Sequence, residues 1–192
     1  MMNDEPLRVP TGENHIVRGP GEYFWQEGET GVLPLRISEG VVAYRRGVVA
    51  VGLIGPGELA MPIPGVVSLG PAAAELVAVT ETVAHPVDPA ETPFSEADLT
   101  TSALAVLIGA DRLGNMNLPR RLAALLLDIT EMTGVPTVGC RQEILAIAAA
   151  ARRETVATIL SDWRDRELIH TRYRKTRIVD RDALIRIRDG EE

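Results

Sequence analysis

The chain has 192 residues, 45% of them apolar, and a formal net charge of −7. This composition excludes a disordered chain and suits one large or two small folded domains. The single cysteine excludes a disulfide framework and any metal or iron–sulfur site built from cysteines alone. No apolar signal segment opens the sequence, and prolines interrupt the apolar stretch at 48–79, so we expect a cytoplasmic protein that does not cross a membrane.

After a loose tail at 1–12, the sequence from 15 to about 87 has the features of β-structure. Short runs rich in Val and Ile, such as 33–37, 41–44, 48–54 and 75–79, are divided by Gly and Pro. Strands of about five residues at near-regular spacing predict a compact antiparallel roll or barrel. Such a roll would also suit a cupin-like metal enzyme, but that chemistry needs clustered His and Glu ligands. The three histidines are scattered at 15, 85 and 170, so we expect no enzyme and no metal.

A long helix is expected next. Ser95 and Asp98 predict a capping box, and Gly114 marks the stop. One side of this helix carries an apolar stripe: Leu99, Ala103, Val106, Leu107, Ala110 and Leu113. The stripe can pack on the roll or face the same helix of a second subunit. A further helix is expected from 118 to about 132.

The stretch 140–180 predicts a helix, a tight turn, a second helix and a basic hairpin. Glu143 follows Cys140 by three residues, which is the spacing of a capping box, and the alanines at 148–151 allow two helices to approach closely. The second helix has an apolar face at Val156, Ile159, Leu160 and Trp163. This order of elements is a winged helix-turn-helix, which places its second helix in the major groove of DNA.

The distribution of charge favours the same interpretation. Residues 1–139 contain 8 basic and 17 acidic residues, whereas 140–192 contain 12 basic and 10 acidic residues. The side chains expected at the DNA are therefore on the second helix, namely Arg152, Arg153, Glu154, Thr155 and Thr158, and on the hairpin, namely Arg172, Arg174, Lys175 and Arg177. Arg can donate two hydrogen bonds to guanine, and Glu can accept one from cytosine. Hairpin cations would contact phosphates.

Several segments in this order resemble the Crp/Fnr family of bacterial transcription regulators. The segments are 21–29, 37–45, 53–59, 120–127, 153–156 (R-E-T-V) and 180–184. The resemblance implies a homodimer joined by the long helix, an effector-binding roll, and activation or repression through contact with RNA polymerase. It also implies that Arg141 and Gln142, on the first helix of the motif, contact phosphate or base edges.

The sequence departs from this family in the roll and in the motif. Pro62 stands where a cyclic-nucleotide binder has a ribose-binding Glu, and no Lys or Arg occurs from 47 to 111. A buried phosphate without a cation partner loses much of its stabilisation, so we expect no cyclic-nucleotide binding and no cofactor. His15 and His85 are the histidines of the roll that could serve as haem ligands, and neither lies at a spacing typical of a ligand motif. In the motif, Thr158 replaces an arginine, the interval from Glu143 to Glu154 is one residue longer than usual, and the turn glycine is missing.

The sequence thus predicts an α+β fold with three parts: an antiparallel β-roll (cupin-like jelly roll) at 1–92, a dimerisation helix at 93–115, and a winged helix-turn-helix domain at 116–192. We expect a homodimeric regulator that binds palindromic double-stranded DNA and acts on RNA polymerase without cyclic AMP. A regulator that needs an unidentified small ligand, or a redox signal at Cys140, is the alternative, because a helix N-terminus beside Arg141 would lower the pKa of the thiol.

Overall fold

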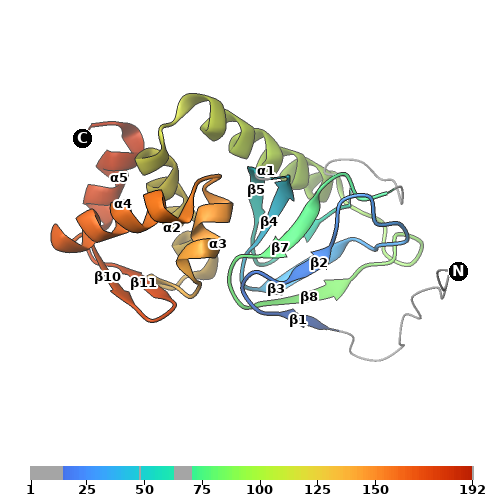
Figure 1. Cartoon of the computed structure of the whole chain (residues 1–192). Coiled ribbons are helices and arrows are strands. Elements are labelled where there is room, and N and C mark those ends of the chain that lie inside the picture. Colours follow the sequence, from blue (N-terminus) through green and yellow to red (C-terminus); the bar gives the residue numbers. More distant parts are fainter. Residues whose placement is uncertain (1–14, 48, 63–70, 192) are drawn as a thin grey trace, which may run out of the picture.

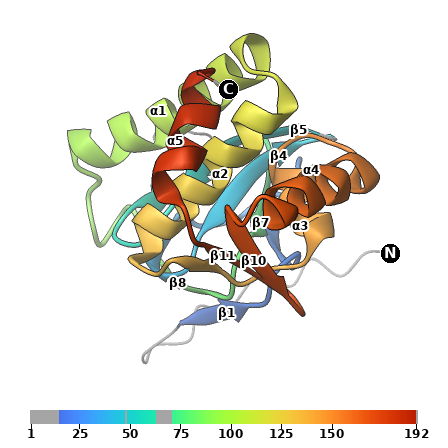
Figure 2. The same cartoon turned by 90° about the vertical axis from the view of Figure 1, so that its left-hand side faces the viewer.

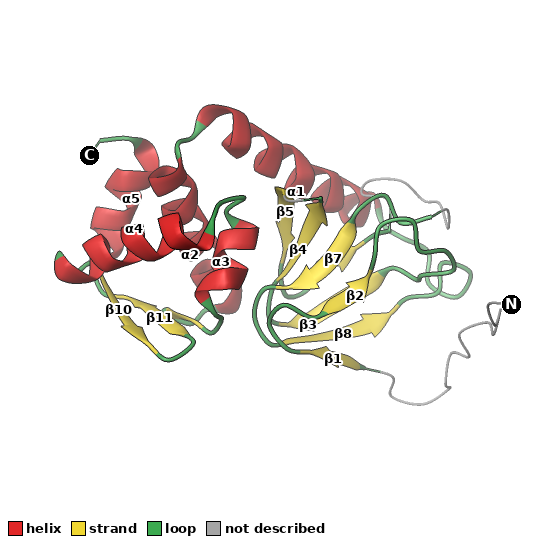
Figure 3. Ribbon diagram, in the orientation of Figure 1, coloured by secondary structure: helices red, strands yellow, loops and turns green. Residues whose placement is uncertain are grey.

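A computed structural model describes residues 15–47, 49–62 and 71–191, and the tail predicted at 1–12 lies outside these ranges. The N-terminal half is a roll of two antiparallel sheets (Figure 1 and Figure 3). One sheet has the order β1–β8–β3–β6, formed by Ile16–Arg18, Thr82–Pro86, Leu35–Glu39 and Leu59–Ala60. The other has the order β2–β7–β4–β5, formed by Tyr23–Trp25, Glu75–Ala78, Val42–Arg46 and Val49–Ile54. The predicted β-roll is therefore confirmed.

The interior of the roll is filled by aromatic and aliphatic side chains. Trp25 is 2% exposed and donates its indole N–H to the carbonyl of Ala74 at 3.0 Å. Tyr44 is fully buried; its hydroxyl accepts from the Met61 backbone N–H at 2.6 Å and lies 3.2 Å from the Ser102 hydroxyl. Burial raises the pKa of Tyr44 to about 12, so this hydroxyl stays protonated. The polar atoms of both aromatic side chains are thus satisfied by protein groups.

Helix α1 (Glu96–Asn115) lies along the second sheet and closes the roll (Figure 1). It begins with the predicted capping box between Ser95 and Asp98. A Cβ at Gly52 of β5 would lie 2.6 Å from the Ala105 carbonyl oxygen, so glycine lets the helix backbone contact the strand. The position of α1 is therefore set by close packing on the roll.

The C-terminal part has four helices and a small three-stranded sheet within the described residues. The helices are α2 (Leu118–Thr133), α3 (Gln142–Ala148), α4 (Arg153–Asp165) and α5 (Arg181–Asp189). The strands are β9 (Thr137–Val138), β10 (Ile169–Arg172) and β11 (Lys175–Ile178), in the order β10–β11–β9. Helix α2 begins at the cap Asn117 and ends at Gly134, which has φ +67°. In Figure 2, α5 lies in front of α2, and strands of the roll lie behind it.

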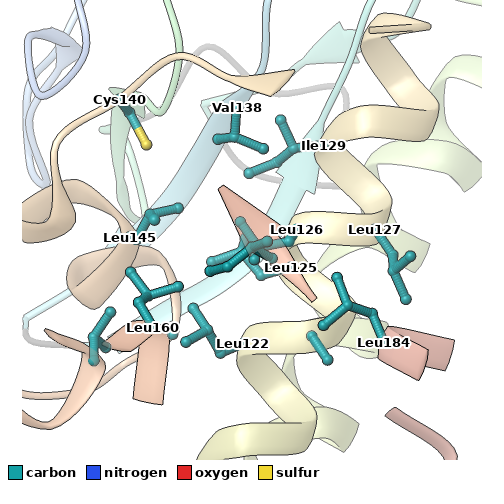
Figure 4. Close-up of a cluster of buried hydrophobic side chains, with 14 of the residues drawn as sticks. Leu122, Leu125, Leu126, Leu127, Ile129, Val138, Cys140, Leu145, Leu160 and Leu184 are labelled. Carbon is teal, nitrogen blue, oxygen red and sulfur yellow. The ribbon is translucent and has the colours of Figure 1, made fainter. Parts of the chain in front are cut away.

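A single hydrophobic cluster joins the helices to the roll. Figure 4 shows its centre, where leucines of α2 meet Leu145 of α3 and Leu160 of α4. Val41 and Val79 of the roll belong to the same cluster. The predicted boundary at 116 remains a prediction, and apolar packing crosses it.

The described ranges contain no helix that is both long and apolar enough to span a bilayer.

Candidate nucleic-acid interface

Helix α3 begins one residue later than the spacing of Cys140 and Glu143 predicted. Its N-cap is Arg141, which makes no side-chain capping bond, so the predicted capping box at Cys140 is wrong. The Cys140 thiol instead points into the core near Leu145 (Figure 4), and burial raises its pKa to about 12. The expected lowering of this pKa is also wrong, because burial of the thiol disfavours its charged form. The raised pKa keeps the thiol un-ionised at neutral pH, and the thiolate is the reactive form of cysteine.

The turn between α3 and α4 lacks the usual glycine, and an alanine adopts the backbone conformation that glycine would have. Ala150 has φ +51°, in the left-handed region that glycine normally occupies. Its backbone N–H donates to the carbonyl of Ile147 at 3.0 Å, and that of Ala151 donates to Ala146 at 2.9 Å. Alanine therefore forms this turn at the expense of backbone strain, and α4 begins at the N-cap Arg152.

Helix α4 divides into a buried face and an exposed face, as predicted. Val156, Leu160 and Trp163 are buried in the shared core, whereas Ile159 is half-buried. The exposed positions at its start are Arg152, Arg153, Glu154, Thr155 and Thr158. Because the apolar face fixes the helix on the domain, these polar side chains face solvent.

Two of these polar side chains already have partners. The guanidinium of Arg153 lies 3.2 Å from the carboxylate of Glu143 on α3, and both side chains are about half exposed. The Thr158 hydroxyl donates to the Glu154 carbonyl oxygen at 3.0 Å. The ion pair with Glu143 thus holds Arg153 near the start of α3. In the sequence, only the opposite charges of the two side chains indicated that they could pair.

We call the hairpin β10–β11 (residues 169–178) the wing. Its strand β11 pairs with β9 on the side away from β10. Arg172 pairs with Lys175, and Thr176 pairs with Val138 of β9. Thr176 and Ile178 are buried, whereas Lys175 and Arg177 alternate with them and are exposed. The alternation of the strand therefore places its cations on the solvent face.

The start of α3, the start of α4 and the wing enclose an open hollow of about 410 Å³. Its lining contains Cys140, Arg141, Gln142, Glu143, Arg153 and residues 171–176. Five of these side chains are cationic and one is a carboxylate, so the hollow is basic on a chain that is acidic overall. A basic hollow between a helix start and a hairpin suits a phosphate backbone.

The structure brings together most of the expected DNA contacts. Arg141, Gln142, Arg153, Arg172, Arg174 and Lys175 line the hollow. Arg152, Glu154, Thr155, Thr158 and Arg177 are exposed but do not line it. The sequence did not predict that Glu143, the only carboxylate in the lining, or Tyr173, which is 82% exposed on the wing, would lie at this surface.

The apolar stripe expected on α1 is divided between two environments. Val106 packs on the core of the roll, and Leu113 lines a small hollow with Gly52 and Leu53. Leu107 is 63% exposed, and Ala110 is also exposed. Leu99 and Ala103 are half-buried. Two residues outside the expected stripe, Leu104 and Ile108, are 48% and 49% exposed.

The roll has a pair of histidine side chains that the sequence did not predict. His15 and His85 lie with ring centroids 6.2 Å apart, because β1 pairs with β8. Within the described ranges, no three His, Cys, Asp or Glu side chains gather as a metal site would require. The pair is too small a set to hold a metal by itself.

Comparisons with known proteins agree with this geometry. Residues 120–187 match the Crp-like helix-turn-helix domain. No curated protein sequence matches the chain. Among solved structures, it is similar to a CRP-family transcriptional regulator of Thermus thermophilus, with 22% identity, a TM-score of 0.69 and coverage of 91% of this chain and 96% of that one. A CRP/FNR-family regulator of the same organism has 21% identity, a TM-score of 0.70 and coverage of 92% and 98%.

FixK2 of Bradyrhizobium japonicum, at 16% identity, has a TM-score of 0.71 with coverage of 91% and 96%. The structural likeness covers the roll, α1 and the helical part together, and the domain match covers the segment that carries the basic hollow. The chain is therefore a DNA-binding transcription regulator with the Crp/Fnr fold and a Crp-like helix-turn-helix domain.

Proposed function

We propose that the protein binds a specific palindromic DNA site as a homodimer, without cyclic AMP, and controls transcription through RNA polymerase. The observation that carries the proposal is the basic hollow between the start of α4 and the wing, beside exposed Arg153 and Glu154. A helix start in the major groove can read base edges with these two side chains, while the surrounding cations hold the phosphates.

Selection from a pool of random duplexes with ligand-free protein tests sequence readout. We expect enrichment of a palindrome whose half-site centres are about 34–36 Å apart. Arg153→Ala should relax the preference at one base position by roughly 1–3 kcal/mol. Arg164→Ala is the matched control, because Arg164 is exposed on the last turn of α4, outside the hollow. Binding without enrichment of any sequence would contradict the proposal.

The exposed apolar side chains of α1 support the homodimer. Leu104, Leu107 and Ile108 are spaced three and four residues apart, so they share one face of the helix. The opposite face, with Ser102 and Ala105, packs on the roll. An apolar stripe on an exposed helix face is stabilised by packing against another apolar face, and a two-fold axis along α1 would supply one.

Sedimentation of a charge variant tests this interface. Leu107→Asp should convert the dimer to monomers and weaken binding to the palindrome, because a carboxylate would be buried at the interface. Val135→Asp introduces the same charge at a side chain that is 50% exposed in the loop after α2. The control should remain dimeric. Equal sedimentation of both variants and the wild type would contradict the use of α1.

Independence from cyclic AMP is supported by the packing of the roll. The Tyr44 hydroxyl is satisfied by Met61 and Ser102, and Pro62 is buried beside them. No Lys or Arg occurs from 47 to 111 to pair with a phosphate. We expect cyclic AMP to leave both DNA affinity and thermal stability unchanged. A rise in either would contradict this part of the proposal.

Action on RNA polymerase is tested by transcription in vitro from a promoter that carries the selected site. The wild type should change transcript yield in one direction, and Arg153→Ala should remove the change. An unchanged yield despite full occupancy of the site would contradict a role in transcription through this site.

A further inference from the structure

The tip of the wing is built differently from the rest of the basic surface. Tyr173 and Arg174 form the two-residue turn between the paired residues Arg172 and Lys175. Tyr173 is 82% exposed, and the Arg174 guanidinium lies 4.8 Å from the centre of its ring. The tip therefore presents a guanidinium backed by an aromatic ring, at the point of the hairpin farthest from its buried strand residues.

Arg174 is also available for a ligand. Arg153, across the hollow, is paired with Glu143, whereas Arg174 has no acidic partner among the described residues. No Asp or Glu occurs from 168 to 179, so the wing offers it none locally. Within the described part of the chain, its guanidinium contacts the ring of Tyr173. This contact orients the guanidinium while its N–H groups stay free to donate.

The hollow fixes which groove the tip would meet. Its walls carry cations on both sides, with Arg153 on the helix side and Arg172 and Lys175 on the wing side. A sugar–phosphate strand placed between these walls has the major groove on one side and the minor groove on the other. If α4 lies in the major groove, the wing tip lies across that strand, over the adjacent minor groove.

We propose that Arg174, supported by Tyr173, enters the minor groove beside each half-site and selects A·T pairs there. The inference rests on the proposed function, because it takes α4 to be in the major groove. A narrow A·T minor groove has an enhanced negative potential that attracts arginine, whereas the exocyclic amino group of guanine projects into the groove at G·C pairs. The wing thus adds sequence preference outside the bases that α4 reads.

Four duplexes with the selected palindrome and different flanks test the proposal at fixed salt concentration. The flanks contain A·T, G·C, inosine·cytosine or diaminopurine·thymine pairs. Inosine·cytosine presents the minor groove of A·T and the major groove of G·C, and diaminopurine·thymine does the reverse. The wild type should bind the A·T and inosine·cytosine duplexes about 5- to 10-fold more tightly than the other two.

Variants of the wing assign the preference to its tip. Arg174→Ala should bind all four duplexes with equal affinity, and Tyr173→Ala should reduce the preference while Tyr173→Phe keeps it. Arg177→Ala is the matched control, because it removes the same charge from an exposed position on β11 away from the turn. It should weaken binding to all four duplexes by the same factor and keep their ratio.

Two results would overturn the inference while leaving the proposed function intact. One is specific binding to the palindrome with no effect of the flanks, or with inosine·cytosine behaving like G·C. The other is an Arg174→Ala variant that weakens all four duplexes equally and keeps the wild-type ratio, which would make Arg174 a phosphate contact. Loss of specific binding by the wild type would instead overturn the proposed function and this inference with it.

Discussion

The roll and the helix-turn-helix domain are each built around one buried tryptophan, yet their surfaces differ in charge. Trp25 and Trp163 are each 2% exposed. Residues 1–139 are strongly acidic, whereas 140–192 carry a small excess of basic residues. Each region therefore has a buried tryptophan in its core, and the surface charge separates the region that suits nucleic acid from the region that repels it.

The two regions also differ in which residue types adopt positive φ angles. The described part of the roll has its positive-φ positions at glycines, whereas Ala150, Glu167 and Arg174 have positive φ in the helical part. Two of these, Ala150 and Arg174, lie in the turn before α4 and at the tip of the wing. Unfavourable backbone geometry thus occurs close to the proposed DNA surface, where position matters more than stability.

The largest expected effect comes from breaking the core that the two regions share. Trp163→Ala should destabilise the protein by about 3–5 kcal/mol, because it removes a large buried ring and leaves a cavity. The variant keeps Trp25 as its single tryptophan, so fluorescence then reports the roll alone. Because the apolar cluster crosses between the regions, the Trp25 transition should move to lower denaturant.

Trp163→Phe is the control for this experiment, and its loss of stability should be much smaller. A Trp25 transition at the wild-type denaturant concentration in Trp163→Ala would show that the regions unfold independently.

A smaller effect is expected where the roll contacts α3. Gly21 has φ +91°, and a Cβ there would lie 2.7 Å from Cδ1 of Ile144. Gly21→Ala should therefore lower the free energy of unfolding in two ways. One is the strain of a left-handed residue, and the other is overpacking against Ile144, which costs about 1–3 kcal/mol. Gly28 has φ +83° and no atom within 4 Å of the place that a Cβ would take, so Gly28→Ala isolates the strain.

Denaturant unfolding of the two variants measures the difference. Equal losses of stability would mean that Ile144 moves aside freely and that the contact does not restrain the two regions.

Relief of strain in the turn before α4 should increase stability. Ala150→Gly is expected to stabilise the protein by about 1 kcal/mol, because glycine adopts φ +51° without a steric penalty. Ala148→Gly, at the last position of α3, should instead destabilise it by roughly the same amount. Thermal unfolding of both variants checks the sign. A loss of stability in Ala150→Gly would show that the methyl group contributes more by packing than the strained backbone costs.

The smallest effect concerns the ion pair that holds the start of α1 to the roll. Arg36 donates to the Asp98 carboxylate at 2.6 Å. This bond, together with the hydrogen bonds from Ser95, lowers the pKa of Asp98 from 3.8 to about 2. A lowered folded-state pKa stabilises the protein above the unfolded value, and this contribution is lost as pH falls through 3.8 towards 2. Asp98→Asn should cost about 1 kcal/mol or less near pH 7.

Unfolding free energies measured from pH 7 to pH 2 check the sign. The difference between wild type and Asp98→Asn should shrink as the pH falls. Glu96→Gln, in the same first turn but without the Arg36 contact, should give a smaller difference at pH 7. A difference that grows on acidification would contradict the assignment of the ion pair.

Sequence reasoning succeeded where a local rule decided the outcome. The capping box at Ser95, the stop of α2 at Gly134 and the buried face of α4 each follow from residues within one or two turns. It failed at Cys140, because side-chain direction there depends on the core formed by α2 and α4. It left open whether the apolar stripe of α1 packs on the roll or on a second subunit, and Val106 is partly buried against the core of the roll.

The sequence by itself determined the order of elements and the basic character of residues 140–177, because periodicity, turn residues and charge are local properties of the chain. The Crp/Fnr-type architecture was implied by the resemblance of several segments in order, including R-E-T-V at 153–156. Tertiary structure alone decided that Arg153 meets Glu143, that the wing and two helix starts share one hollow, and that Leu104 and Ile108 remain exposed on α1. These relations join residues distant in sequence, and their geometry depends on how apolar faces pack in three dimensions.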